Sequence, residues 1–184
     1  GYRKITDPAH RAAVAAVWGV DPDRIPGPGV PAVELLGMLG APGGVRALLV
    51  HGSNVVVSGP DASTIRAGLA ALDLLVVCDF VLSETAELAD IVLPVTQWAE
   101  EEGTMTNLEG RILRRRRAID PPPGVRSELD ILADLARRLD APSAWPTEPA
   151  AVFDELARAS EGGIADYSGL SHALLDAQDE HGIA

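Results

Sequence analysis

Two short and almost continuous apolar runs constrain the fold of this 184-residue chain most strongly. Residues 45–50 are Val-Arg-Ala-Leu-Leu-Val, and residues 74–79 are Leu-Leu-Val-Val-Cys-Asp. Runs of this length without polar alternation are typical of strands buried on both faces of a parallel sheet. A helical pattern at residues 62–72 separates the two runs, and residues 91–93 predict a third strand. This alternation of strands and helices predicts an α/β fold.

Further helices are predicted before, within and after this core in the sequence. Asp7, Pro8 and Gly19 have the residue types that begin and end a helix, which predicts one between them. The remaining predicted helices are a short one at 32–39, one at 84–89 capped by Ser83, an amphipathic one at 127–139 and one at 150–159 with Thr147 as its cap. Residues 103–107 are predicted to form a polar loop, followed by a basic strand at 111–117.

Composition excludes several classes of protein. The single cysteine, Cys78, rules out a disulfide framework, a four-cysteine zinc site and a self-contained iron–sulfur cluster. A net charge of −12 argues against a nucleic-acid partner, because such proteins present a basic face. No apolar run is long enough to predict a membrane span.

Two polar clusters follow the first two predicted strands. They are Gly52-Ser53-Asn54 and the segment from Asp79 to Ser83. The carboxyl ends of parallel strands share one edge of a sheet, where ligands bind. Gly52 would let backbone amides approach an anion, and Asp79 could accept two N–H bonds from a guanine or bond the hydroxyls of a ribose. Spacing alone leaves nucleotide binding and ordinary turn chemistry both open, and the GxGxxG fingerprint is absent.

Four other features have simpler explanations. His51 is interpreted as a packed or solvent-facing side chain, and Cys78 as a small buried hydrophobe. The acidic run 100–102 is interpreted as a solvated turn, because consecutive carboxylates cannot all face one metal ion. The basic run 114–117 is interpreted as a surface or domain contact.

Residues 45–139 resemble the molybdopterin oxidoreductase family. The matching segments, in the family's order and spacing, are Ala47–Asn54, Leu72–Phe80, Ser83–Pro94 and Glu102–Arg111. Val55 departs from the proline that often follows the glycine loop in the family, and Cys78 replaces a frequent glutamine. The resemblance implies a three-layer αβα sandwich with a mostly parallel sheet, a dinucleotide-binding variant without GxGxxG.

The resemblance also implies a cofactor and the residues that would hold it. Members of the family bind bis-molybdopterin guanine dinucleotide, which carries molybdenum. By position, Asp79 matches the acidic residue that recognises guanine in the family. Ser83 matches a residue whose hydroxyl lies near the same nucleotide. The other residues matching cofactor contacts are Gly52, Ser53, Asn54, Asn107 and Arg111. The 4Fe-4S cysteines, the molybdenum ligand and the C-terminal barrel domain of the family have no counterpart here, so the fragment alone is expected to be inactive and to hold no metal.

Both ends of the chain look cut, so it is interpreted as a piece of a longer catalytic subunit. We expect a lead-in at 1–44, a cofactor-binding core at 45–140 and a helical extension at 141–184 that leads toward the missing barrel. The flanks resemble the assimilatory nitrate reductase branch, which implies a cytoplasmic enzyme, a small anion as substrate and an electron donor such as ferredoxin, flavodoxin or an NAD(P)H-linked reductase. A formate dehydrogenase fragment and a scaffold domain of the large iron–sulfur subunit of NADH dehydrogenase are the alternatives.

Overall fold

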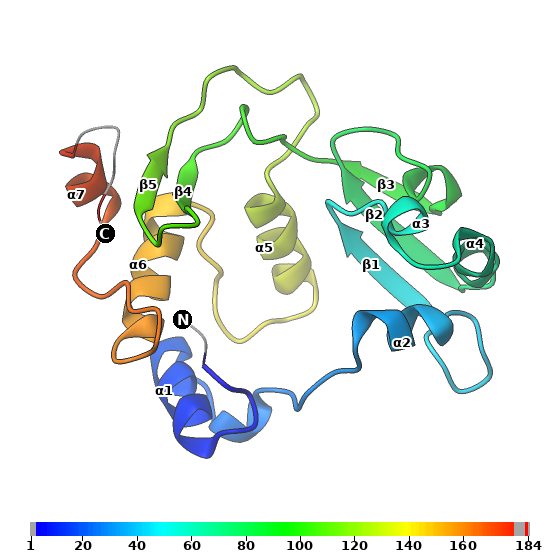
Figure 1. Ribbon diagram of the computed structural model, residues 1–184, viewed down its shortest axis with the longest axis horizontal. Helices are drawn as coiled ribbons and strands as arrows, with labels where there is room; N and C mark the ends of the chain where they lie inside the picture. The colour runs from blue at the N-terminus through cyan, green and yellow to red at the C-terminus, as the bar shows by residue number, and fades with distance from the viewer. Residues whose placement is uncertain (1–2, 179–182, 184) are drawn as a thin grey trace. The chain divides into compact units, whose positions relative to one another are not determined.

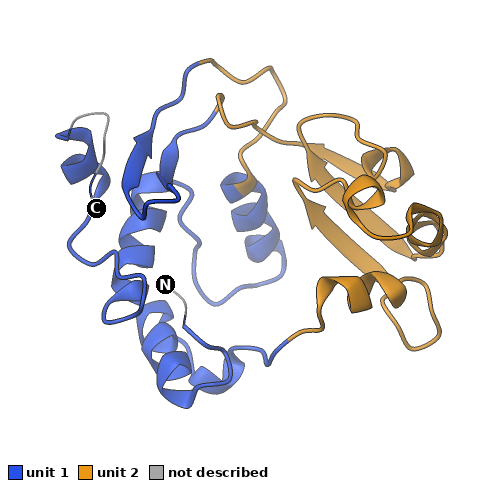
Figure 2. Cartoon of the chain, viewed as in Figure 1, with its two compact units in different colours: residues 1–28, 101–118, 129–184 blue, residues 29–100, 119–128 orange. Residues whose placement is uncertain are grey.

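The computed structural model describes residues 3–178 and 183, and the chain divides into two compact units (Figure 2). Unit 1 takes in residues 1–28, 101–118 and 129–184. Unit 2 takes in residues 29–100 and 119–128, so it holds the three strands predicted for the parallel sheet.

The sheet of unit 2 has three parallel strands in the order β1-β2-β3 (Figure 1). They are β1 (Ala47–His51), β2 (Leu74–Asp79) and β3 (Ile91–Pro94). Val50 is in register with Val77, and Val77 with Val92, so these three side chains share one face. The predicted mixed α/β fold with a parallel sheet is therefore confirmed.

The core of unit 2 lies on the face of the sheet that carries Val50 and Val77. Apolar side chains from three helices pack there: α2 (Ala32–Gly37), α3 (Val55–Ser58) and α4 (Ala62–Ala70). Asp61 caps α4 by accepting from the Thr64 amide, and hydrogen bonds from Thr64 and Ser63 lower the Asp61 pKa to about 2. The buried members of this cluster are Leu39, Val50, Val56, Ile65, Leu69, Leu75, Val77 and Ala86.

The opposite face of the sheet is also apolar but is less covered. Leu49, Leu74 and Ile91 all lie on it, and they are 39%, 40% and 47% exposed. A parallel sheet normally has both faces buried. The helices α2 to α4 therefore supply one covering layer for this sheet.

Unit 1 combines helices with a two-stranded antiparallel hairpin. The hairpin is β4 (Gly103–Thr106) paired with β5 (Ile112–Arg115). Ile112 packs with Phe153 and Leu175 in a small core. The helices are α1 (Pro8–Trp18), η1 (Pro22–Arg24), α5 (Glu128–Arg138, whose first residue belongs to unit 2), α6 (Pro149–Ser160) and α7 (His172–Asp176). Among the described residues, no helix is long and apolar enough to cross a membrane.

Helix ends agree with the predictions in one case and differ in another. Asp7 caps α1 by accepting from the Ala9 amide at 2.9 Å, and Gly19 ends it at φ +65°, as predicted. The predicted cap at Thr147 is wrong, because α6 begins at Pro149 and Glu148 holds the cap position without a side-chain bond.

Four short elements differ from the sequence-based expectations. Residues 103–106 form β4 instead of a loop, since pairing with β5 satisfies their backbone. The predicted helix at 84–89 is a single 3-10 turn, η2 (Ala86–Leu88). Helices α3 and α7 were not expected, and each is at most five residues long, too short to show a helical period in the sequence.

Gly40 of unit 2 offers a test of close packing, with Gly19 of unit 1 as its matched control. Both have φ +65°, but a Cβ on Gly40 would overlap the Cβ of Ala71, whereas a Cβ on Gly19 meets no atom within 4 Å. Gly19→Ala should cost about 1–2 kcal/mol for the left-handed backbone alone. Gly40→Ala should cost about 1–3 kcal/mol more from overpacking. Urea denaturation of both variants measures the difference, and equal losses would show that the Ala71 contact relaxes freely.

Candidate functional site

The carboxyl ends of β1 and β2 bring the two predicted polar clusters to one edge of the sheet in unit 2. His51 is in register with Cys78, and the Gly52 amide still donates to the Cys78 carbonyl at 2.8 Å. The loop after β1 therefore begins beside the end of β2. The prediction that these segments share a sheet edge is confirmed.

Gly52 turns the chain away from the sheet. Its φ of +53° lies in the left-handed region, where glycine is favoured, and apart from its chain neighbours no atom of the described residues comes within 4 Å of the position that a Cβ would take. The space beside its backbone is thus open to another molecule. Ser53 follows it and is half-buried.

The side-chain amide of Asn54 connects the two clusters. Its Oδ1 accepts from the Thr85 hydroxyl at 2.9 Å, and its Nδ2 donates to Oε2 of Glu84 at 2.6 Å. Thr85 Oγ1 also accepts from the Val56 amide at 3.1 Å. This hydrogen bond from Asn54 is the main reason why the pKa of Glu84 lies below its ordinary value.

Asp79 and Ser83 form a buried pair at the end of β2. Ser83 Oγ donates to Asp79 Oδ2 at 2.8 Å, and the Phe80 amide donates to Oδ1 at 2.9 Å. The Ala86 amide in turn donates to Ser83 Oγ at 3.3 Å. An ionised carboxylate has about four acceptor positions, so two internal bonds leave Asp79 with further capacity.

Exposed apolar side chains border this pair. Phe80, Val81 and Leu82 are all exposed, and they lie between the two buried polar residues Asp79 and Ser83. Three consecutive exposed apolar residues are unusual on a free surface, and they suggest a ligand or a covering segment at this edge.

Asn107 and Arg111 lie in unit 1, at the turn of the β4–β5 hairpin. Asn107 Oδ1 accepts from the amides of Glu109 and Arg111, at 3.0 and 2.9 Å, and the Asn107 amide donates to the Arg111 carbonyl. Gly110, at φ +82°, completes the turn. The Asn107 side chain thus shapes the turn that displays the half-buried Arg111.

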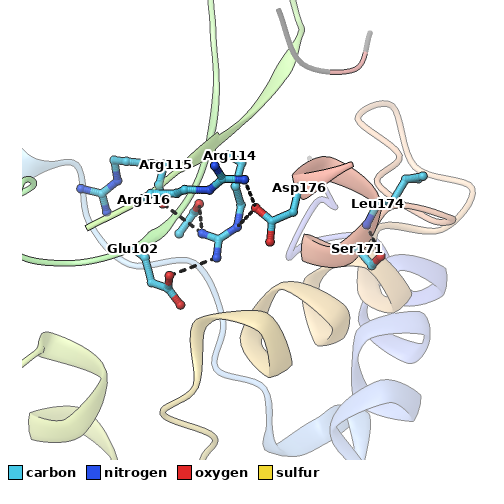
Figure 3. Close-up of polar contacts among 8 residues, drawn as sticks. Glu102, Arg114, Arg115, Arg116, Ser171, Leu174 and Asp176 are labelled. Carbon is cyan, nitrogen blue, oxygen red and sulfur yellow. Dashed lines mark hydrogen bonds and ion pairs between the residues drawn. The ribbon is translucent and has the colours of Figure 1, made fainter. Parts of the chain in front are cut away.

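The basic and acidic runs meet at the other end of the hairpin (Figure 3). Arg114, with a side chain only 11% exposed, pairs with Glu102 at 3.1 Å and with Asp176 at 3.2 Å. Arg114 also donates to the Gly103 carbonyl, and Arg115 pairs with Glu101 at 2.7 Å. The predicted contact role of the basic run is confirmed within unit 1. The acidic run is partly exposed, as expected of a solvated turn, and two of its carboxylates also pair with arginines of the hairpin, which was not predicted.

His51 and Cys78 lie beside each other on the less covered face of the sheet. His51 Nδ1 is 3.3 Å from Oε1 of Glu128, and its Nε2 is buried without a partner among the described residues. Cys78 is fully buried, and burial raises the pKa of its thiol. The interpretation of Cys78 as a small hydrophobe is confirmed. Among the described residues, no group of three or more His, Cys, Asp or Glu side chains could hold a metal.

Sequence reasoning missed Glu84 and Thr85. Both lie in a segment that was expected to be a short helix, and nothing in the local pattern marks Thr85 as buried. Their roles depend on contact with Asn54, about 30 residues earlier.

Comparisons with known proteins identify a family. The model of the molybdopterin oxidoreductase family matches residues 26–138. The chain is 40% identical to an assimilatory nitrate reductase catalytic subunit of Bacillus subtilis, over 95% of this chain and 25% of that protein. It is 42% identical to an assimilatory nitrate reductase of Haloferax mediterranei, over 97% of this chain and 25% of that protein. The chain therefore spans about a quarter of the length of these relatives.

Relatives with other names also match. They include an F420-dependent formate dehydrogenase 1 subunit alpha of Methanococcus maripaludis, at 32% identity over 98% of this chain and 26% of that protein. A subunit of an NADH-quinone oxidoreductase of Rhizobium meliloti is 36% identical, over 96% of this chain and 20% of that protein. The solved structure of acetylene hydratase from Pelobacter acetylenicus is similar in fold, with a TM-score of 0.64 at 22% identity, over 96% of this chain and 24% of that one.

The hydrogen bond between Asn54 and Glu84 can be tested through the pKa of the Glu84 carboxyl. Removing the donor in Asn54→Ala should raise the Glu84 pKa toward its ordinary value. Because the folded-state pKa is depressed, the bond stabilises the protein above the unfolded-state pKa, and this stabilisation is lost as the pH falls through the folded-state pKa. Carboxyl-carbon NMR titration measures the change. Asp134, whose pKa is lowered chiefly by Arg137, should stay unchanged, and an unchanged Glu84 pKa would contradict the prediction.

Proposed function

Since the chain belongs to the molybdopterin oxidoreductase family, we propose that it is the part of an assimilatory nitrate reductase that holds one guanine dinucleotide of bis-molybdopterin guanine dinucleotide. The observation that supports this most directly is the meeting of the Gly52–Asn54 loop with the Asp79–Ser83 pair at one edge of the sheet.

The residues of this edge fit a nucleotide. The open space beside Gly52 would admit a phosphate close to the backbone. Asn54 Nδ2 is a donor on the exposed side of the loop, now bonded to Glu84. Asp79 retains acceptor positions for the N–H groups of a guanine, and Ser83 holds its carboxylate in one orientation.

We assign roles to these residues on that basis. Gly52 and Ser53 would contact the phosphates, Asn54 would donate to an oxygen of the nucleotide, and Asp79 would accept from the base. When bound, the molybdenum cofactor supplies the oxygen-atom transfer that reduces nitrate to nitrite. This part of the protein binds and orients the nucleotide end and takes no part in the redox step.

We propose that Asn107 and Arg111 contribute to the cofactor layer, and that the domains divide at residues 44 and 140. The 4Fe-4S cluster, the molybdenum ligand and the barrel would belong to other parts of the catalytic subunit. We further propose a second helical layer that completes the αβα sandwich, a cytoplasmic location, and a ferredoxin, flavodoxin or NAD(P)H-linked reductase as electron donor.

Two alternatives have relatives in their favour. A formate dehydrogenase would use the same edge for the same nucleotide, and its relative is 32% identical. A scaffold domain of an NADH-quinone oxidoreductase is supported by a relative at 36%. The identities of 40% and 42% favour nitrate reductase. Against the scaffold, the open glycine loop and the buried acid with spare acceptor positions have no evident use without a ligand.

The role of Asp79 can be tested in the full-length enzyme by Asp79→Asn. The asparagine keeps the shape of the side chain but replaces one acceptor oxygen with an NH2 donor. It therefore cannot accept from two guanine N–H groups with two oxygens, and the cofactor should be retained about tenfold less well. Molybdenum and guanine nucleotide per protein measure the retention. The control is Asp73→Asn, which changes an exposed acid paired with Arg46 just before the other end of β2. Equal cofactor content in both variants would contradict the assignment.

The substrate is tested separately with the full-length wild-type enzyme. The enzyme should rapidly oxidise a reduced electron donor when nitrate is the acceptor, and its oxidation of formate should be undetectable. The opposite result would establish the formate dehydrogenase alternative. A molybdenum-free protein without either activity would establish the scaffold alternative.

A further inference from the structure

Thr85 is a fully buried polar residue with no role in the assignment above. It is 0% exposed, and its hydroxyl accepts from the Val56 amide and donates to Oδ1 of Asn54. A hydroxyl has a single proton, and the proton of Thr85 goes to Asn54. One side chain after β2 thus fixes both the loop that follows β1 and the start of α3.

Thr85 and Glu84 together determine which way the Asn54 amide faces. The Thr85 proton needs an acceptor, which Oδ1 supplies, and the Glu84 carboxylate needs a donor, which Nδ2 supplies. In the reversed orientation the amide oxygen would face the Glu84 carboxylate, and the Thr85 proton would face an NH2 group. The hydrogen-bond network therefore selects the orientation with the donor toward the exposed side.

We propose that Thr85 is a positioning residue for the cofactor loop, acting through Asn54. It holds Nδ2 toward the open side of the loop, so that the amide donates to an anionic oxygen of the nucleotide. In the structure Nδ2 donates to the Glu84 carboxylate, and the proposal requires an anionic oxygen of the nucleotide to take the place of that carboxylate. This inference rests on the proposed function, because it takes the nucleotide as the ligand of the Gly52–Asn54 loop.

The test uses the full-length holoenzyme and follows the loss of guanine nucleotide and molybdenum with time after dilution. Thr85→Val removes the hydroxyl with little change of volume and should release the cofactor about tenfold faster. Thr85→Ser restores the hydroxyl and should behave like the wild type. Asn54→Asp keeps the bond from Thr85 but has no donor, so it should release the cofactor as fast as Thr85→Val, and it tests the mechanism even if Thr85→Val does not fold.

Ser160→Ala is the matched control for stability. Ser160 is also fully buried, and its hydroxyl also makes two bonds, to the Ala157 carbonyl and from the Tyr167 amide, but it lies in unit 1. Thermal unfolding should show comparable losses for Ser160→Ala and Thr85→Val, while Ser160→Ala keeps the cofactor.

The unfavourable results distinguish a failure of this inference from a failure of the proposed function. Wild-type retention in Thr85→Val or in Asn54→Asp would overturn the inference, and so would fast release in Thr85→Ser or in Ser160→Ala. A wild-type holoenzyme that contains no guanine nucleotide would instead overturn the proposed function.

Discussion

The parallel pairing of β1 with β2 is the interaction on which the rest of unit 2 depends. Its register places His51 beside Cys78, and the bond from the Gly52 amide to the Cys78 carbonyl extends the pairing by one residue into the loop. Because both strands run the same way, the segments that follow them must begin at the same edge. The packing of Val50 and Val77 under α3 and α4 holds this register, since a slip by one residue would turn these side chains away from the core.

A second constraint acts between the two loops at this edge. The buried hydroxyl of Thr85 and the buried carboxylate of Asp79 have all their observed partners within the segments 52–56 and 79–86. A buried polar group that loses its partner is costly, so these bonds make the loop geometry part of the fold. The polar groups at this edge are thus held in place by the fold itself, and a ligand bound there would have a lower ordering cost.

Much of this arrangement could be predicted from the sequence. The apolar run at 74–79 gave the bounds of β2 because the strand lies at the centre of the sheet, where burial leaves no polar alternation. The adjacency of Gly52 and Asp79 followed from parallel topology alone. The roles of Glu84 and Thr85 could not be predicted, because they depend on a side chain some 30 residues away. Strand β4 was missed since four residues of mixed polarity show no period of their own.

The position of the strands within the sheet has one more consequence. β2 is central and bonded on both sides, whereas β1 is an edge strand. Edge elements open locally at lower free energy than central ones, so we expect the segment after β1 to open more readily than the segment after β2. Fraying of β1 would move the glycine loop while Asp79 keeps its place as a fixed reference point. Exchange of a bound group at this edge would then need only local opening, and the fold of unit 2 would persist throughout.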